Sequence, residues 1–110
     1  MYGKVNESDW KQFRQKLPGW QEAYMQKLID EYIAMLTGPG AASVKFWDLE
    51  KRIRQDKRDT GVVAEMRRSV MDTNIMNLLA EGAITLDDLD GFSEELKGRM
   101  ALWAERHTEG

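Results

Sequence analysis

The sequence contains no cysteine, a single histidine and only two prolines among its 110 residues. Without cysteine there is no disulfide, no thiolate ligand and no cysteine nucleophile, and His107 alone cannot complete a zinc site. We therefore expect neither a bound metal nor a cofactor. The prolines stand at positions 18 and 39, which leaves long stretches of the chain without a helix breaker.

Long hydrophobic runs are also missing. No stretch approaches the ~20 apolar residues that a membrane span requires, and the N-terminal segment MYGKVNESDW lacks the apolar core of a secretory signal. We expect a cytoplasmic protein that does not contact a membrane. The 16 Lys and Arg against 19 Asp and Glu give a net charge of −3, which is too mild to indicate a polyanionic partner.

The length and the spacing of apolar residues predict one all-α domain over residues 1–110. The β-branched residues never alternate over the length of a strand. We expect an irregular bundle with no sheet, made of four main helices and a C-terminal fifth helix. Their predicted ranges are 7–16, 18–37, 44–58, 62–81 and 92–106.

Local signals set the boundaries of these helices. Pro18 disfavours the α conformation at the preceding residue but suits the first turn of a helix, so we expect a break between 16 and 18. Thr60-Gly61 predicts a second break, before Val62. Asp88 follows Thr85 by three positions, which is close to the capping-box motif and predicts a short helical turn at 86–90.

The predicted helix 18–37 is apolar over about half of its circumference, more than a peripheral helix of a small bundle can bury. It is therefore either the central helix of the bundle or an interface. Methionine and aromatic side chains are enriched at interface cores. The predicted interaction surface consists of Trp20, Tyr24, Met25, Tyr32 and Met35. This pattern predicts a protein that acts by protein–protein contact, as a homodimer or as an adapter on another cytoplasmic protein.

The predicted helix 44–58 carries the one feature typical of nucleic-acid binding. Trp47, Lys51, Arg54 and Arg58 fall on one face, where an aromatic ring beside cations can stack on a base while the cations neutralise phosphates. Acidic residues are interleaved between positions 48 and 59, as on an ordinary solvated face. Nucleic-acid binding is thus the alternative function, and protein contact is the first.

Two polar residues interrupt the apolar stripes of neighbouring predicted helices. Glu50 lies within the stripe of helix 44–58 and Arg67 within that of helix 62–81, so we predict that they form an ion pair between the two helices. Asp and Glu are plentiful elsewhere, but their spacing does not single out a pair for proton transfer. We expect no enzymatic activity.

Several motifs run through most of the chain. They are Glu7-Ser8-Asp9-Trp10, Trp20-Gln21-Glu22-Ala23-Tyr24, Lys45-Phe46-Trp47 with Leu49-Glu50-Lys51-Arg52-Ile53, Met66-Arg67-Arg68-Ser69 and Glu81-Gly82-Ala83-Ile84-Thr85. In these motifs the chain resembles a group of short bacterial helical proteins that carry the label "multidrug transporter". The resemblance implies a bacterial origin but no activity and no site residues. Separately, the stretch 78–85 resembles the helix–Gly–Ile–Thr–helix turn of short bacterial C-terminal oligomerisation modules.

Overall fold

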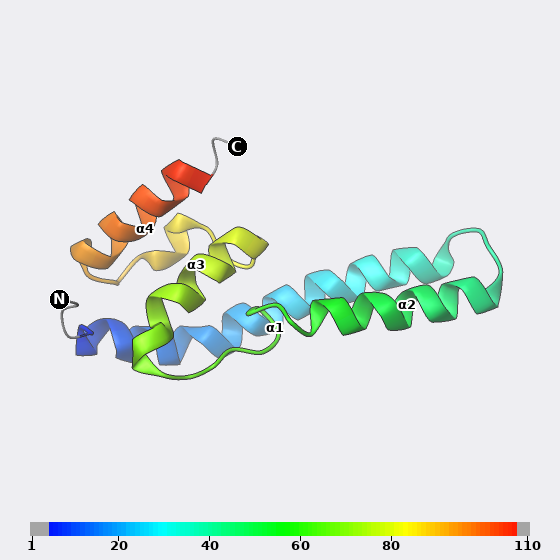
Figure 1. Ribbon diagram of the computed structural model, residues 1–110, viewed down its shortest axis with the longest axis horizontal. Coiled ribbons are helices and arrows are strands. Elements are labelled where there is room, and N and C mark those ends of the chain that lie inside the picture. Colours follow the sequence, from blue (N-terminus) through cyan, green and yellow to red (C-terminus); the bar gives the residue numbers. More distant parts are fainter. Residues whose placement is uncertain (1–4, 108–110) are drawn as a thin grey trace.

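The computed structural model describes residues 5–107, which fold entirely into helices, turns and loops without a strand (Figure 1). The α-helices are α1 (Glu7–Thr37), α2 (Ala42–Asp56), α3 (Met71–Glu81) and α4 (Glu94–His107). Two short 3₁₀ helices, η1 (Arg68–Val70) and η2 (Leu86–Leu89), precede α3 and α4. The all-α prediction is confirmed, but the arrangement of four main helices and a fifth is not found.

Helix α1 runs without interruption through Pro18, so the predicted break between 16 and 18 is wrong. Asn6 caps the helix, because its side-chain oxygen accepts a hydrogen bond of 3.1 Å from the amide of Asp9. The buried side chains of α1 continue along one face on both sides of the proline; they are Asp9, Trp10, Phe13, Leu17, Tyr24 and Leu28. Burial of this continuous face outweighs the hydrogen bond that Pro18 cannot donate.

The molecule is elongated, with extents of 54 × 29 × 24 Å. The second half of α1 and the antiparallel helix α2 project away from the remaining helices (Figure 1). We call residues 24–56 the arm. The N-terminal part of α1 packs with α3, η2 and α4 at the other end of the molecule, and we call this part the body.

The hydrophobic core lies in the body. Phe13, Ile75, Leu78, Leu96 and Met100 are fully buried in it and come from α1, α3 and α4. Asp9, itself buried, ties the beginnings of α1 and α4 together, since its carboxylate accepts from the amide and the hydroxyl of Ser93 at 2.7 and 2.6 Å. The body therefore has its own core, and the arm contributes little to it.

The predicted helix 62–81 is wrong over its first half, because α3 begins only at Met71. The expected break at Thr60-Gly61 is present, but the chain stays non-helical from there to residue 67. The carboxylate of Glu81 accepts from the amides of Thr60 and Gly61 at 2.8 and 2.9 Å. Asn74 donates to the carbonyl of Glu65 at 2.8 Å, so side chains of α3 provide partners for the backbone of this segment.

The remaining boundaries agree with the sequence to within two residues, and the predicted helix 44–58 is α2, which begins and ends two residues earlier. The predicted turn at 86–90 is η2, and the capping box between Thr85 and Asp88 is formed. The predicted helix 92–106 corresponds to α4, two residues shorter at its start. Ser93 accounts for the difference, because its hydroxyl accepts from the amide of Leu96 at 3.2 Å and so begins the helix.

Candidate interaction surface

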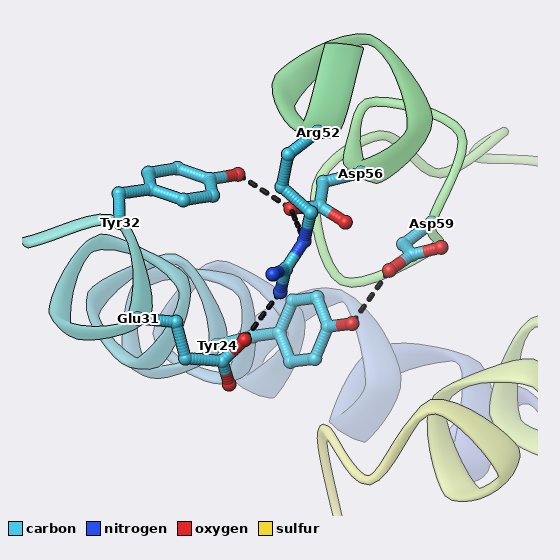
Figure 2. A network of polar contacts seen from close by, with 6 residues as sticks. All are labelled: Tyr24, Glu31, Tyr32, Arg52, Asp56 and Asp59. Carbon is cyan, nitrogen blue, oxygen red and sulfur yellow. Dashed lines mark hydrogen bonds and ion pairs between the residues drawn. The ribbon is translucent and has the colours of Figure 1, made fainter. Parts of the chain in front are cut away.

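Polar side chains hold the two helices of the arm together (Figure 2). The hydroxyl of Tyr32 on α1 donates to Asp56 on α2 at 2.6 Å, and Arg52 donates to the same carboxylate at 2.9 Å. Arg52 also pairs with Glu31 on α1. These four side chains bridge α1 and α2 and are half-buried, so the seam between α1 and α2 is largely a hydrogen-bonded network.

The network shifts the pKa values of its members. Burial, followed by the hydrogen bond to Asp56, raises the pKa of Tyr32 to about 12. Burial and then the hydrogen bond to Asp59 raise the pKa of Tyr24 above its ordinary value. The bond to Glu31 raises the pKa of Arg52. Both phenols therefore stay protonated donors, and the guanidinium stays charged, throughout the neutral range.

A second set of contacts fixes the base of the arm on the body. Tyr24 is buried there and donates to Asp59 at 2.6 Å, just beyond the end of α2. Gln21 donates to the carbonyl of Thr60 at 3.0 Å. Since Glu81 of α3 binds the amides of Thr60 and Gly61, the same segment contacts α1 and α3 together. These contacts set the direction in which the arm projects.

Large apolar side chains of the arm remain outside both the seam and the core. On α1, Ile29, Ile33 and Leu36 are 47%, 53% and 42% exposed, and on α2, Phe46 and Ile53 are 63% and 36% exposed. Helix α2 has no buried residue at all. The apolar stripe predicted for this helix is therefore present, but it does not face the core of the same chain.

The exposed stripes of the two helices lie on the same face of the arm. At 100° per residue, the side chains of each stripe are rotated by roughly 40–150° from the side chains that face the seam, in the same sense along their own chain. Because α1 and α2 are antiparallel, equal senses of rotation bring both stripes to one side. We call this set the arm face; it consists of Met25, Ile29, Ile33, Leu36, Phe46, Leu49 and Ile53. An open groove of about 500 Å³ runs along its α2 half, beside Phe46, Leu49 and Ile53.

The structure places most of the predicted interaction residues elsewhere. Tyr24 is buried at the base of the arm, and Tyr32 and Met35 are half-buried. The ring of Trp20 stacks on that of Phe92 in the body, with centroids 6.3 Å apart. Of the five predicted residues, Met25 alone belongs to the arm face, where it is half-buried. The predicted helix 18–37 thus carries an exposed apolar face, but its aromatic residues pack or form hydrogen bonds within the same chain.

The four residues of the predicted nucleic-acid face are all exposed. Trp47 is 63% exposed and meets the ring of Phe46 edge to face, with centroids 5.0 Å apart. Lys51 and Arg54 follow on α2, whereas Arg58 lies in the turn after its end. Arg54 is already paired with Glu50, at 3.1 Å from its Nε. Among residues 5–107, Trp47 thus presents an exposed ring, and Lys51 and Arg58 have no ion-pair partner.

The predicted ion pair between Glu50 and Arg67 is wrong. Glu50 pairs with Arg54 one turn away on the same helix, and Arg67 pairs with Glu65 at 2.6 Å. Both predicted partners are exposed, so neither needs a buried counter-charge. The physical reason is that residues 62–67 do not form a helix against α2, as the prediction assumed.

The exposure of Ile29, Ile33, Leu36, Phe46 and Ile53 was not predicted. A signal was present in the sequence, since the apolar arc of residues 18–37 is wider than one partner helix can cover. The prediction instead selected aromatic residues and methionines, which are typical of interface cores. The polar contacts between α1 and α2 draw the tyrosines inward and leave the aliphatic side chains exposed.

No family model, no curated protein and no solved structure matches this chain. Among residues 5–107, no helix has both the length and the apolar character to cross a membrane. Within the same part of the chain, no three histidine, aspartate or glutamate side chains are grouped as a metal site would require.

Proposed function

We propose that this protein is a protein–protein interaction module whose arm face binds an apolar helical surface of another polypeptide in the cytoplasm. One observation carries the proposal: five large apolar side chains, each at least 36% exposed, share one face of an arm that the body supports only at its base. They are Ile29, Ile33, Leu36, Phe46 and Ile53.

The size of the arm face supports binding. The five side chains together expose roughly 500 Å² of apolar surface, in the upper part of the range found for the largest patch on a monomeric protein. Patches of this size that polar residues surround usually mark interaction sites. Here Glu50, Arg54 and Lys57 stand beside the apolar groove of α2. The arm face has the same arrangement as an interface, with an apolar centre and a charged margin.

The composition of the seam supports the same proposal. An isolated helical hairpin is most stable when its apolar stripes face each other and its polar side chains face water. In this arm, Tyr32, Arg52 and Asp56 lie at the seam, and the isoleucines Ile29 and Ile33 lie outside. An arm built in this way gains the full stabilisation of its apolar residues only when another surface covers them.

We propose binding and not catalysis because the buried carboxylate of Asp9 and the half-buried carboxylate of Glu81 already make structural contacts. Both oxygens of Asp9 accept from Ser93, and both oxygens of Glu81 accept from backbone amides. The remaining polar cluster, around Arg52 and Asp56, bridges the helices of the arm. These groups support the fold and are not directed into a substrate pocket.

Site-specific photo-crosslinking in the producing cell tests the proposal. A benzoylphenylalanine at position 33 lies on the arm face, whereas the same group at position 34 lies about 100° further round α1, outside the arm face and also exposed. We expect protein adducts from position 33 and not from 34, and we expect Phe46→Glu to abolish them. Equal adducts from the two positions, or none from position 33, would contradict the proposal.

The alternative function, nucleic-acid binding, rests on the exposed ring of Trp47 with Lys51 and Arg58 nearby. Titration with single- and double-stranded nucleic acid at low and physiological salt separates the two functions. We expect weak binding that salt abolishes, because few phosphates can be neutralised by this face. Sub-micromolar binding at physiological salt that Trp47→Ala removes would favour nucleic acid as the partner.

A further inference from the structure

We infer that the surface bound by the arm face is a second copy of this chain, with α1 of each arm against α2 of the other. The inference rests on the proposed function and identifies the partner. Two features of the arm support it: the area of the face and the arrangement of two antiparallel helices.

The area of two arm faces is sufficient for a stable dimer. Roughly 500 Å² of apolar side chain on each arm amounts to about 1,000 Å² for the pair, before any contribution from the margins. This is the size at which a specific interface becomes distinguishable from a chance contact. A second copy offers an apolar face of equal extent and equal length, so neither face is left partly exposed.

Two antiparallel hairpins that stack through their apolar faces form a four-helix bundle. With the two-fold axis parallel to the helices, each α1 lies against the α2 of the other copy and runs antiparallel to it. Ile29, Ile33 and Leu36 then meet Phe46, Leu49 and Ile53 of the second copy. The apolar core that the single arm lacks is formed between the two copies.

The body leaves this face free. The side chains of α1 that enter the core of the body, including Phe13 and Leu17, project on the other side of the helix from the α1 stripe of the arm face. The bodies of two stacked copies therefore lie away from the contact between the arms.

Sedimentation equilibrium of the purified full chain, from about 1 to about 200 µM, tests the inference. We expect a dimer for the wild type. Ile33→Glu places a charge on the arm face of both copies, and should weaken association about 100-fold or more. Ala34→Glu introduces the same charge about 100° further round the helix, at an exposed position outside the arm face, and should leave the dimer intact. Phe46→Glu repeats the test on α2, and circular dichroism confirms that each variant keeps its helices.

The remaining outcomes separate this inference from the proposed function. A dimer that Ile33→Glu does not weaken would place the contact elsewhere and overturn the inference. A wild type that stays monomeric at all concentrations would also overturn it. If position 33 nevertheless gave crosslinks in the cell, the arm face would bind a different protein, and the proposed function would stand. A monomer without such crosslinks would contradict both.

Discussion

The ring of Tyr24 lies directly against the backbone of Gly61. A Cβ atom at position 61 would be 2.3 Å from Cδ2 of that ring, so only glycine fits there without a shift of the aromatic side chain. The hydroxyl of the same tyrosine donates to Asp59. Tyr24 of α1 thus contacts the segment that follows α2 with both the face of its ring and its hydroxyl. This contact fixes the base of the arm.

Gly61→Ala should therefore destabilise the protein by about 1–3 kcal/mol, because the added methyl group displaces a buried ring. Gly98→Ala is the matched control, since its Cβ would meet no atom within 4 Å and it lies inside α4. The control should be stabilised by about 0.5–1 kcal/mol through helix propensity. Urea unfolding measures both, and equal effects of the two substitutions would contradict the tight contact at Gly61.

Asp9→Ala should destabilise the protein by about 2–4 kcal/mol, because it leaves the amide and hydroxyl of Ser93 without their buried acceptor. Asp72→Ala also removes a carboxylate, but one that pairs with Arg99 at the surface. Asp72→Ala should lower the free energy of unfolding by about 1 kcal/mol or less. Thermal unfolding of the two variants provides the comparison, and a cost for Asp9→Ala no larger than for Asp72→Ala would be inconsistent with its role as a tie between α1 and α4.

The course of α1 shows where local signals mislead. A proline normally ends a helix, and Pro18 led to a predicted break. The apolar residues Phe13, Leu17 and Tyr24 nevertheless keep helical spacing across it, and all three are buried. Short-range chemistry is sufficient to predict the class of fold, the end of a helix at Gly82 and the turn at Thr85. The continuity of α1 depends on packing against α3 and α4, which no local signal reports.

Pro18→Ala should stabilise the protein by about 1–3 kcal/mol, because it supplies an amide donor inside a helix and removes the clash of the proline ring. Pro18 is exposed, so no packing is lost. Differential scanning calorimetry should show a higher melting temperature. A lower melting temperature would mean that the two halves of α1 are separate helices, as the sequence suggested.

The polar seam of the arm makes stability sensitive to alkaline pH. The pKa of Tyr32 is raised from its ordinary value of 10 to about 12, so the folded arm favours the neutral phenol. The stabilisation of the folded state by the neutral phenol is present below pH 10 and is lost as the pH rises from 10 to about 12. Tyr32→Phe should therefore flatten the fall in stability over this range, measured by urea unfolding at successive pH values. An unchanged pH dependence would show that the phenol does not bind Asp56 in solution.

The arm face was only partly predictable. The excess of apolar residues in the second half of α1 indicated an interface, but the stripe of Phe46, Leu49 and Ile53 on α2 is indistinguishable from a core stripe in the sequence. Which way α2 turns depends on the network of Tyr32, Arg52 and Asp56, in which Tyr32 lies 20 or more positions from the other two along the chain. Two of the aromatic residues predicted for the interface, Tyr24 and Tyr32, instead hold the arm.

Our central proposal is that another polypeptide covers the arm face in the cell. Hydroxyl-radical footprinting of intact cells measures the exposure of this face most directly. Phe46 reports on the arm face, and Leu102, which is 56% exposed on α4, reports on the body. We predict that Phe46 reacts several-fold less in the wild type than in the Ile33→Glu variant, whereas Leu102 reacts equally in both. Equal reactivity of Phe46 in the two proteins would contradict the account.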